Sequence, residues 1–278
     1  ASGGQDISVG AAIAIAGSVI LRVLCGGNAR PETLQAPIIV AFLVACVVAM
    51  LFGAFNGVLV AYFKIQPMVA TLILYTAGRS IAAWINNNEL PVISDPKFAY
   101  FGGFIPGIPI PTPCFIAVAC MIVIGIVLKV TNLRLYTQAV GINQSSSKLN
   151  GLNPEMIKVL TYVILGLCVA VAGLIKVSRV SSINYSVIAK DIEMDAILAV
   201  ALGGNALSGG KFNMAASIIG AFVIQCLTTT LYKFGVSSTA LPAYKAVVVI
   251  LLVIVSAPTV REYFDTIMKK IKISKEVA

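Results

Sequence analysis

Ionisable side chains are few in this 278-residue sequence, and their types limit the chemistry that it could perform. Charged residues make up 11% of the chain, and the sequence contains no histidine. This absence removes the Ser-His-Asp triad, the usual zinc cage and histidine proton relays. The six cysteines are scattered without a CxxC pair and mostly lie inside apolar runs, as small buried hydrophobic residues do. We therefore predict no catalytic residue, no metal site and no cofactor.

The sequence around Gly209, Gly210 and Lys211 is similar to a phosphate-binding loop but lacks its defining residues. A P-loop needs a glycine, four further residues, and then Gly-Lys followed by serine or threonine. Asn205 stands at the first glycine position, and Phe212 follows the lysine. The glycines are better explained by close helix packing and a backbone break inside a membrane protein. If the chain moves a solute uphill, the energy must then come from an ion gradient or from a partner ATPase.

The charges next to apolar runs help to separate those two energy sources, because an ion-coupled carrier needs ionisable groups deep in the membrane. Asp6 lies beside a glycine kink, and Asp191, Glu193 and Asp195 lie at the start of a short apolar segment. No carboxylate lies in the middle of an apolar segment, which disfavours ion coupling. Arg79 does lie well inside one, and both a functional and a structural role fit it.

The elements that would position these residues are membrane helices. Hydrophobic residues make up 59% of the chain and the mean hydropathy is +0.96, which excludes an ordinary soluble enzyme. At about 20 residues per span, the chain has room for roughly eight to ten spans. We predict an all-α, polytopic transmembrane bundle with eight segments, at residues 7–24, 38–63, 69–85, 115–130, 159–175, 192–202, 214–231 and 243–255.

The connections between these segments indicate how the chain crosses the membrane. Residues 131–158 are polar and basic, and by the positive-inside rule we predict a cytoplasmic loop there. A basic tail, residues 259–278, is predicted on the same side. The two assignments agree when all four segments between them cross, the short segment 192–202 included. The net charge of +9 is then explained by membrane topology and not by nucleic-acid binding. Residues 86–113 are rich in proline and cannot be helical throughout.

The sequence also contains a weak internal repeat. Residues 3–10, GGQDISVG, are similar to residues 203–210, GGNALSGG, and a run of small residues follows each. Transporters are commonly built from such repeats. An apolar segment precedes the second copy but not the first, so we expect at least one membrane segment upstream of Ala1.

Four stretches together resemble a known family: GGQDISVG, FNGVLVAYFKIQPMVATL, LYTQAVGINQSSSKLNGL and EMDAILAVALGGNALSGGKFN. They are similar, in order and over nearly the whole chain, to permease subunits of ABC importers for monosaccharides of the ribose, xylose and galactose type. Those permeases belong to a binding-protein-dependent family shared with branched-chain amino acid permeases. Two departures stand out. Residues 146–148 are Ser-Ser-Lys where the family has Ala-Ala-Arg, and Asn205-Ala206 replaces Thr-Ser.

The resemblance implies the large ten-helix importer fold, of which the eight segments of a single, N-terminally incomplete permease domain (1–278) are visible. It implies a multi-pass subunit of the bacterial cytoplasmic (inner) membrane, paired with a second permease copy or a paralogue. An ATP-binding subunit would dock on the loop 131–158, and a periplasmic or surface-anchored sugar-binding protein would deliver the solute. The docking residues would be Gly141, Asn143, Ser146, Lys148 and Gly151.

The function implied is ATP-driven import of a monosaccharide by alternating access, with ATP hydrolysis on the partner subunit and no enzymatic step in this chain. Two alternatives remain: an ABC permease for another solute, such as a branched-chain amino acid, a nucleoside or a furanose signal, and an ion-coupled carrier. Residues that could contact the solute lie near glycine breaks or segment ends, where helix packing or capping explains them equally well. They are Asp6, Ser8, Asn56, Gln66, Thr71, Arg79, Asn205 and Ser208.

Overall fold

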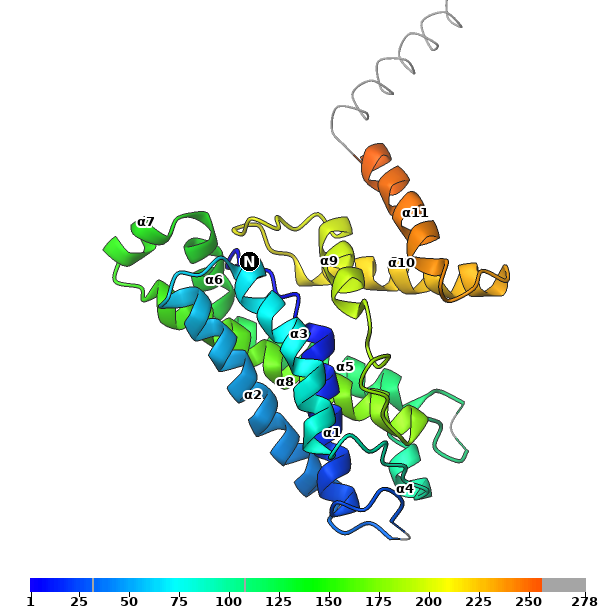
Figure 1. Cartoon of the computed structure of the whole chain (residues 1–278). Coiled ribbons are helices and arrows are strands. Elements are labelled where there is room, and N and C mark those ends of the chain that lie inside the picture. Colours follow the sequence, from blue (N-terminus) through cyan, green and yellow to red (C-terminus); the bar gives the residue numbers. More distant parts are fainter. Residues whose placement is uncertain (32, 108, 257–278) are drawn as a thin grey trace, which may run out of the picture. The chain divides into compact units, whose positions relative to one another are not determined.

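The computed structural model describes residues 1–31, 33–107 and 109–256, and in this part of the chain it is built from helices (Figure 1). All eight predicted segments form helices, which confirms the all-α class. The helices are α1 (Val9–Cys25), α2 (Ile38–Ala61), α3 (Pro67–Ile85), α4 (Pro96–Ala99), α5 (Thr112–Val130), α6 (Leu133–Ile142), α7 (Gln144–Leu149), α8 (Pro154–Val180), α9 (Ile192–Leu202), α10 (Met214–Lys233) and α11 (Leu241–Ser256).

Five of the helices are long and apolar enough to cross a membrane: α2, α3, α5, α8 and α10. The chain is thus a polytopic membrane protein. Helix α1 is apolar but has 17 residues, and the short segment forms α9 with 11 residues. At 1.5 Å per residue, 11 residues span only about 16 Å, roughly half of a bilayer core.

Connecting segments contain helices that the sequence pattern did not specify. The predicted loop 131–158 folds into α6 and α7, and the proline-rich segment 86–113 is mostly irregular around the short helix α4. Helix α8 begins at Pro154, where the Asn153 side chain accepts a hydrogen bond from the Met156 N–H group and Pro154 occupies the first turn. The predicted cytoplasmic tail, residues 259–278, lies outside the described residues.

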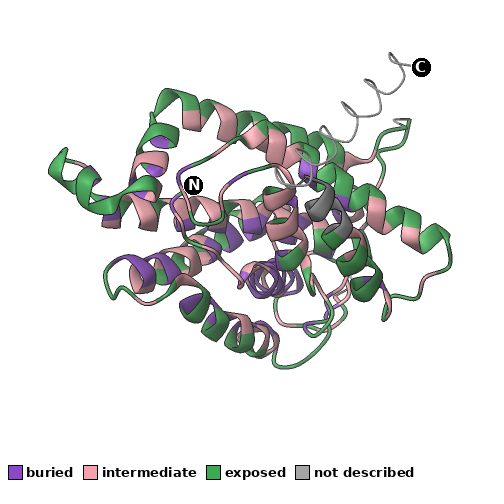
Figure 2. Cartoon of the chain, turned by 90° about the horizontal axis from the view of Figure 1, so that it is seen from above, coloured by how far each residue is buried: buried purple, intermediate pink, exposed green. Residues whose placement is uncertain are grey.

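The described part of the chain divides into two compact units, residues 1–197 with 205–214 and residues 198–204 with 215–256. In the first unit α1 is largely buried and packs against α2, α3 and α8. Figure 2 shows buried residues along the inward helix faces and exposed residues along the outward ones. In the second unit Ala199 and Ile224 form a small buried cluster, and Gly220 lies against the backbone of Ala199. The single permease domain remains a prediction.

Helices α2 and α8 make the most extensive helix contact of the first unit, and glycines line it. A Cβ atom on Gly57 would lie 2.8 Å from the Cα atom of Val159, and one on Gly166 would meet the backbone oxygen of Ala49. Small residues at helix contacts are typical of membrane proteins, where backbones gain dispersion energy by approaching closely. This glycine seam fixes α8, which lines the cavity described below.

The two ends of α8 mark the two ends of the first unit. Helices α6 and α7 pack near its beginning, while Gly102, which follows α4, packs against the backbone of Arg179 near its end. Because α8 has 27 residues, these ends are about 40 Å apart along its axis. Figure 1 shows α7 and α4 at opposite ends of this unit.

Candidate functional site

The two glycine-rich segments of the internal repeat lie in direct backbone contact within the first unit. The Gly210 N–H group donates a hydrogen bond to the Ala1 carbonyl oxygen at 2.8 Å. A Cβ atom on Gly209 would lie 2.9 Å from the Gly3 nitrogen. Gly3, Gly209 and Gly210 have φ values of 78°, 104° and 88°, which residues other than glycine rarely adopt. Two segments about 200 residues apart are thus joined at one point.

Helix α6 rests on this glycine junction, which we define as Ala1, Gly3, Gly209 and Gly210. A Cβ atom on Gly141 would meet both the Ala1 oxygen and the Gly210 nitrogen. Two further α6 side chains hold the same region, because Arg134 and Gln138 each donate to the Phe212 carbonyl oxygen at 3.4 Å. The Arg134 guanidinium also lies 5.8 Å from the centre of the Phe212 ring. A displacement of α6 would therefore act directly on both glycine segments.

The predicted docking residues divide into one packed residue and four exposed ones. Gly141 is half-buried against the junction, whereas Asn143, Ser146, Lys148 and Gly151 are exposed on and around α7. The Asn143 side chain accepts from the Ser146 N–H group at 3.0 Å and so starts α7. Two apolar neighbours, Ile142 and Leu149, are 77% and 90% exposed. The surface combines polar and apolar groups, as protein contacts do.

Four of the predicted solute-contact residues meet in a polar cluster at the start of α1. The Asp6 carboxylate accepts from the Ser8 N–H group at 2.7 Å and from the Ser8 hydroxyl at 2.6 Å. The Asn56 amide donates to the Ser8 hydroxyl oxygen at 3.0 Å, and the Ile7 N–H group donates to Thr71 at 3.1 Å. Burial raises the pKa of the Asp6 carboxyl, and the hydrogen bonds from Ser8 oppose that rise. The cluster ties α1 to α2 and α3.

Replacement of Asp6 by alanine is expected to lower the free energy of unfolding by about 1–3 kcal/mol, because Ser8 loses its acceptor in a site with little water. Asp6→Asn keeps an acceptor oxygen and should lose clearly less. Thermal unfolding of the purified proteins in one detergent measures both changes. Equal losses in the two variants would contradict the hydrogen-bonding explanation and point to the charge instead.

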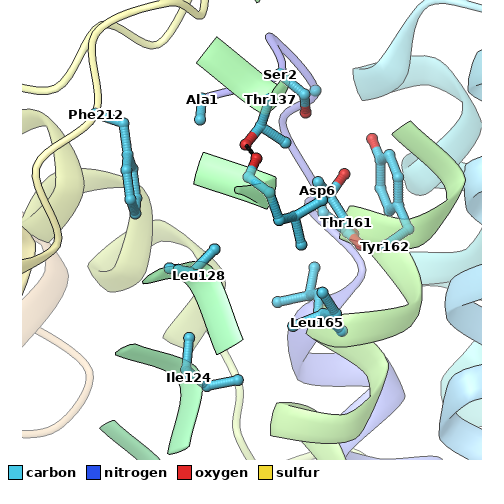
Figure 3. A pocket seen from close by; sticks show the side chains of 13 residues that line it. Ala1, Ser2, Asp6, Ile124, Leu128, Thr137, Thr161, Tyr162, Leu165 and Phe212 are labelled. Atoms are coloured by element: carbon cyan, nitrogen blue, oxygen red, sulfur yellow. Dashed lines mark hydrogen bonds between the residues drawn. The ribbon is translucent and has the colours of Figure 1, made fainter. Parts of the chain in front are cut away.

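A cavity of about 340 Å³ opens beside this cluster, between α5, α6, α8 and the first residues of the chain. Figure 3 shows Asp6 facing it near Thr161 and Tyr162 of α8, with Thr137 of α6 above. The Thr137 hydroxyl is engaged with the Leu133 carbonyl oxygen. The Tyr162 hydroxyl and the Asn56 Oδ1 atom are buried and have no hydrogen-bond partner among the described residues. Apolar side chains complete the wall, among them Ile124, Leu128, Ile164, Leu165 and Phe212.

The other predicted solute-contact residues lie elsewhere. Gln66 and Ser208 are exposed, and Asn205 is buried, where its side-chain amide bonds to the backbone of Asn213 and closes the loop between them. Arg79 donates from Nη1 to the carbonyl oxygens of Tyr185 at 2.7 Å and Ile188 at 3.0 Å. The sequence left both a functional and a structural role open for Arg79. The structure gives its guanidinium two backbone carbonyl groups as hydrogen-bond partners.

Two buried polar residues were missed by sequence reasoning. Tyr162 lies within the apolar run of α8, and nothing in its neighbourhood distinguishes it from an aromatic core residue. Glu193 lies in the first turn of α9, where acids are common because they favour the helix dipole, but its side chain is only 1% exposed. Among the residues that the structure describes, no group of three Cys, Asp or Glu side chains lies close enough to hold a metal ion.

The sequence of the chain matches a known protein family and several named relatives. Residues 1–257 match the family described as branched-chain amino acid transport system / permease component. The galactofuranose transporter permease protein YtfT of Escherichia coli K12 is 38% identical over 258 residues, which cover 92% of this chain and 73% of that protein. The fructose import permease protein FruF of Bifidobacterium longum is 35% identical over 96% of this chain and 74% of its own length.

A third relative, the ribose import permease protein RbsC of Escherichia coli K12, is 32% identical over 91% of this chain and 77% of its own length. No solved structure matches the chain. The three relatives are thus similar over at least 91% of this chain and over 73–77% of their own length.

Proposed function

Because the chain belongs to the family of branched-chain amino acid transport system permease components, we propose that it is the membrane subunit of an ABC importer for a monosaccharide. The protein is a multi-pass transport subunit of the cytoplasmic membrane and not itself an enzyme. The observation that carries the choice of solute is the similarity, over nine-tenths of the chain, to permeases named for galactofuranose, fructose and ribose.

Energy for transport comes, in this proposal, from an ATP-binding subunit that docks on α6 and α7. The exposed residues of α7 supply the contact, and Gly141 passes its movement to the glycine junction. A second permease copy or a paralogue completes the pathway, and a sugar-binding protein delivers the solute. The pathway opens alternately to the two sides of the membrane, and the ATP-bound and ATP-free states of the partner select between these two conformations.

The cavity next to Asp6 suits a sugar better than an amino acid. Sugars need acceptors and donors for hydroxyl groups together with an apolar surface for their C–H faces, and Asp6, Tyr162 and the apolar wall offer these. An amino acid also carries a carboxylate. The side chains that line the cavity include the acid Asp6 but no lysine or arginine, so that carboxylate would have no opposite charge beside it.

Uptake measurements test the proposal. Cells that produce the protein with its ATP-binding and solute-binding partners are expected to accumulate labelled ribose, fructose or galactofuranose, and to stop when the ATPase is inactivated by mutation. Leucine, tested in parallel, should not accumulate. Leucine uptake would favour the branched-chain amino acid alternative, and sugar uptake that persists without ATP hydrolysis would show an ion-coupled carrier.

A further inference from the structure

Arg79 fixes an irregular segment that runs from the end of α8 to the start of α9. This crossing segment, residues 181–191, begins at the α4 end of the first unit, where the Ile93 N–H group donates to the Ser181 carbonyl oxygen at 2.8 Å. The Tyr185 hydroxyl donates to the Glu89 carbonyl oxygen in the same region. From α3, Arg79 binds the carbonyl oxygens of Tyr185 and Ile188. The segment therefore runs along the bundle from the α4 end to the start of α1, where the Ala189 carbonyl oxygen lies against Gly10.

The hydrogen bonds from Arg79 answer a specific need of the segment. Irregular backbone inside a membrane bundle leaves carbonyl groups that no helix satisfies, and each unsatisfied group is costly. The backbone of the segment is also strained, because Ala189 and Asp191 have φ values of 51° and 63°, which residues other than glycine rarely adopt. Ile188, one of the residues bound by Arg79, directly precedes this strained stretch.

The other half of the Arg79 guanidinium faces Glu193. The Nη2 atom of Arg79 and the Oε2 atom of Glu193 are both buried, and neither has a hydrogen-bond partner among the described residues. Both atoms lie above Gly10 of α1, because a Cβ atom built there would meet Glu193 Oε2 and lie 3.4 Å from Arg79 Nη2. Two unsatisfied atoms of opposite charge thus face the same space without forming an ion pair. Gly10 keeps that space open.

We propose that Arg79 and Glu193 form a two-position latch on the crossing segment. In the first position, which the structure shows, Arg79 holds the carbonyl oxygens of Tyr185 and Ile188 and keeps the segment against the bundle. In the second position the guanidinium pairs with the Glu193 carboxylate and releases the two carbonyl groups, so that the segment can move away. The latch rests on the proposed function, because a transporter needs an end that opens and closes.

Two properties of the pair make the second position accessible. An arginine can bind backbone carbonyls or a carboxylate with the same guanidinium, so its charge has a partner in both positions. Release of the carbonyl groups also relieves the left-handed backbone at Ala189 and Asp191. In each position the guanidinium thus has hydrogen-bond partners, either the two carbonyl oxygens or the Glu193 carboxylate. A switch between states of similar free energy requires such an exchange of partners.

A labelling experiment separates the two positions. Ile183 is 1% exposed and Ser186 is exposed on the same segment, so Ile183→Cys reports opening and Ser186→Cys serves as its accessible reference. Each is introduced into protein whose six native cysteines are replaced by alanine, and the assembled transporter is treated in nanodiscs with a charged maleimide. We expect Ile183→Cys to react about tenfold faster in one nucleotide state than in the other, and Ser186→Cys to react equally in both.

The variants distinguish the latch from a purely structural contact. Glu193→Gln removes the second position, so Ile183→Cys should react slowly in both nucleotide states while the protein remains assembled. Arg79→Met removes the grip on both carbonyls, so the same cysteine should react rapidly in both states. Arg179→Met, at an exposed arginine near the end of α8, should behave like the parent protein.

The latch would be overturned if Glu193→Gln kept the nucleotide-dependent change of the parent protein, or if Ile183→Cys reacted at one rate in every state. If Arg79→Met does not accumulate in the membrane, Glu193→Gln alone decides. Uptake by the parent protein is measured in proteoliposomes reconstituted from the same purified transporter. Absence of ATP-dependent sugar uptake there would contradict the proposed function, whereas intact uptake with unchanged labelling in Glu193→Gln would contradict the latch alone.

Discussion

Replacement of Gly141 by leucine is expected to abolish sugar uptake while the protein still inserts and binds its ATPase partner. The side chain would have to occupy the space of the Ala1 oxygen and the Gly210 nitrogen, both of them backbone atoms. Since backbone cannot rotate away as a side chain does, α6 must lift off the glycine junction. We expect uptake to fall by about 100-fold or more, with ATP hydrolysis continuing without transport.

The measurement pairs uptake with a test of assembly. A cysteine at exposed Ser146 should still cross-link to the ATP-binding subunit in the Gly141→Leu protein, because α7 itself is unchanged. Gly125→Leu is the matched control, since nothing lies within 4 Å of a Cβ atom at that position of α5. Normal uptake by Gly141→Leu would show that α6 does not act through the junction. A lost cross-link would show a docking defect instead of uncoupling.

Replacement of Gly166 by leucine is expected to have the largest effect on stability. Its Cβ atom would meet the backbone oxygen of Ala49, and the Cα atom of Met50 lies 3.0 Å from the same point. Overpacking against rigid backbone forces the two helices apart, and we expect a loss of at least about 3 kcal/mol in the free energy of unfolding. Most of the variant should then fail to be recovered as folded protein.

Recovery after solubilisation and the midpoint of thermal unfolding measure this loss. The same Gly125→Leu control should match the parent protein, because leucine favours helix more than glycine does and that site is open. If Gly166→Leu unfolded at the parent temperature, α2 and α8 would not be in the close contact described. The result would also remove the support for Tyr162 and the cavity, which depend on the position of α8.

The sequence by itself determined the elements and the family. Apolar runs bounded by polar or proline-containing segments located the eight predicted membrane segments, all of which are helical, because a run of that composition is stable in a membrane only when its backbone is hydrogen-bonded internally. The start of α8 at Asn153 and Pro154 followed from local capping chemistry. Four motifs in order identified the permease family, which the comparison over residues 1–257 confirms. Each apolar run, helix cap and motif is a local feature, so it can be recognised from the residues of a single segment.

Only the tertiary structure decided which residues meet. Asn56 and Ser8 are 48 residues apart in sequence, and Arg79 and Ile188 are 109 apart, so no spacing rule connects them. No spacing rule predicts the contact of Gly141 with Ala1 and Gly210 either, because it depends on how α6 turns back after α5. Glu193 was indistinguishable from an ordinary first-turn acid until the structure placed its side chain beside Gly10 of α1. These contacts arise from long-range packing of apolar helices, in which backbone approach and burial are fixed by distant segments of the chain.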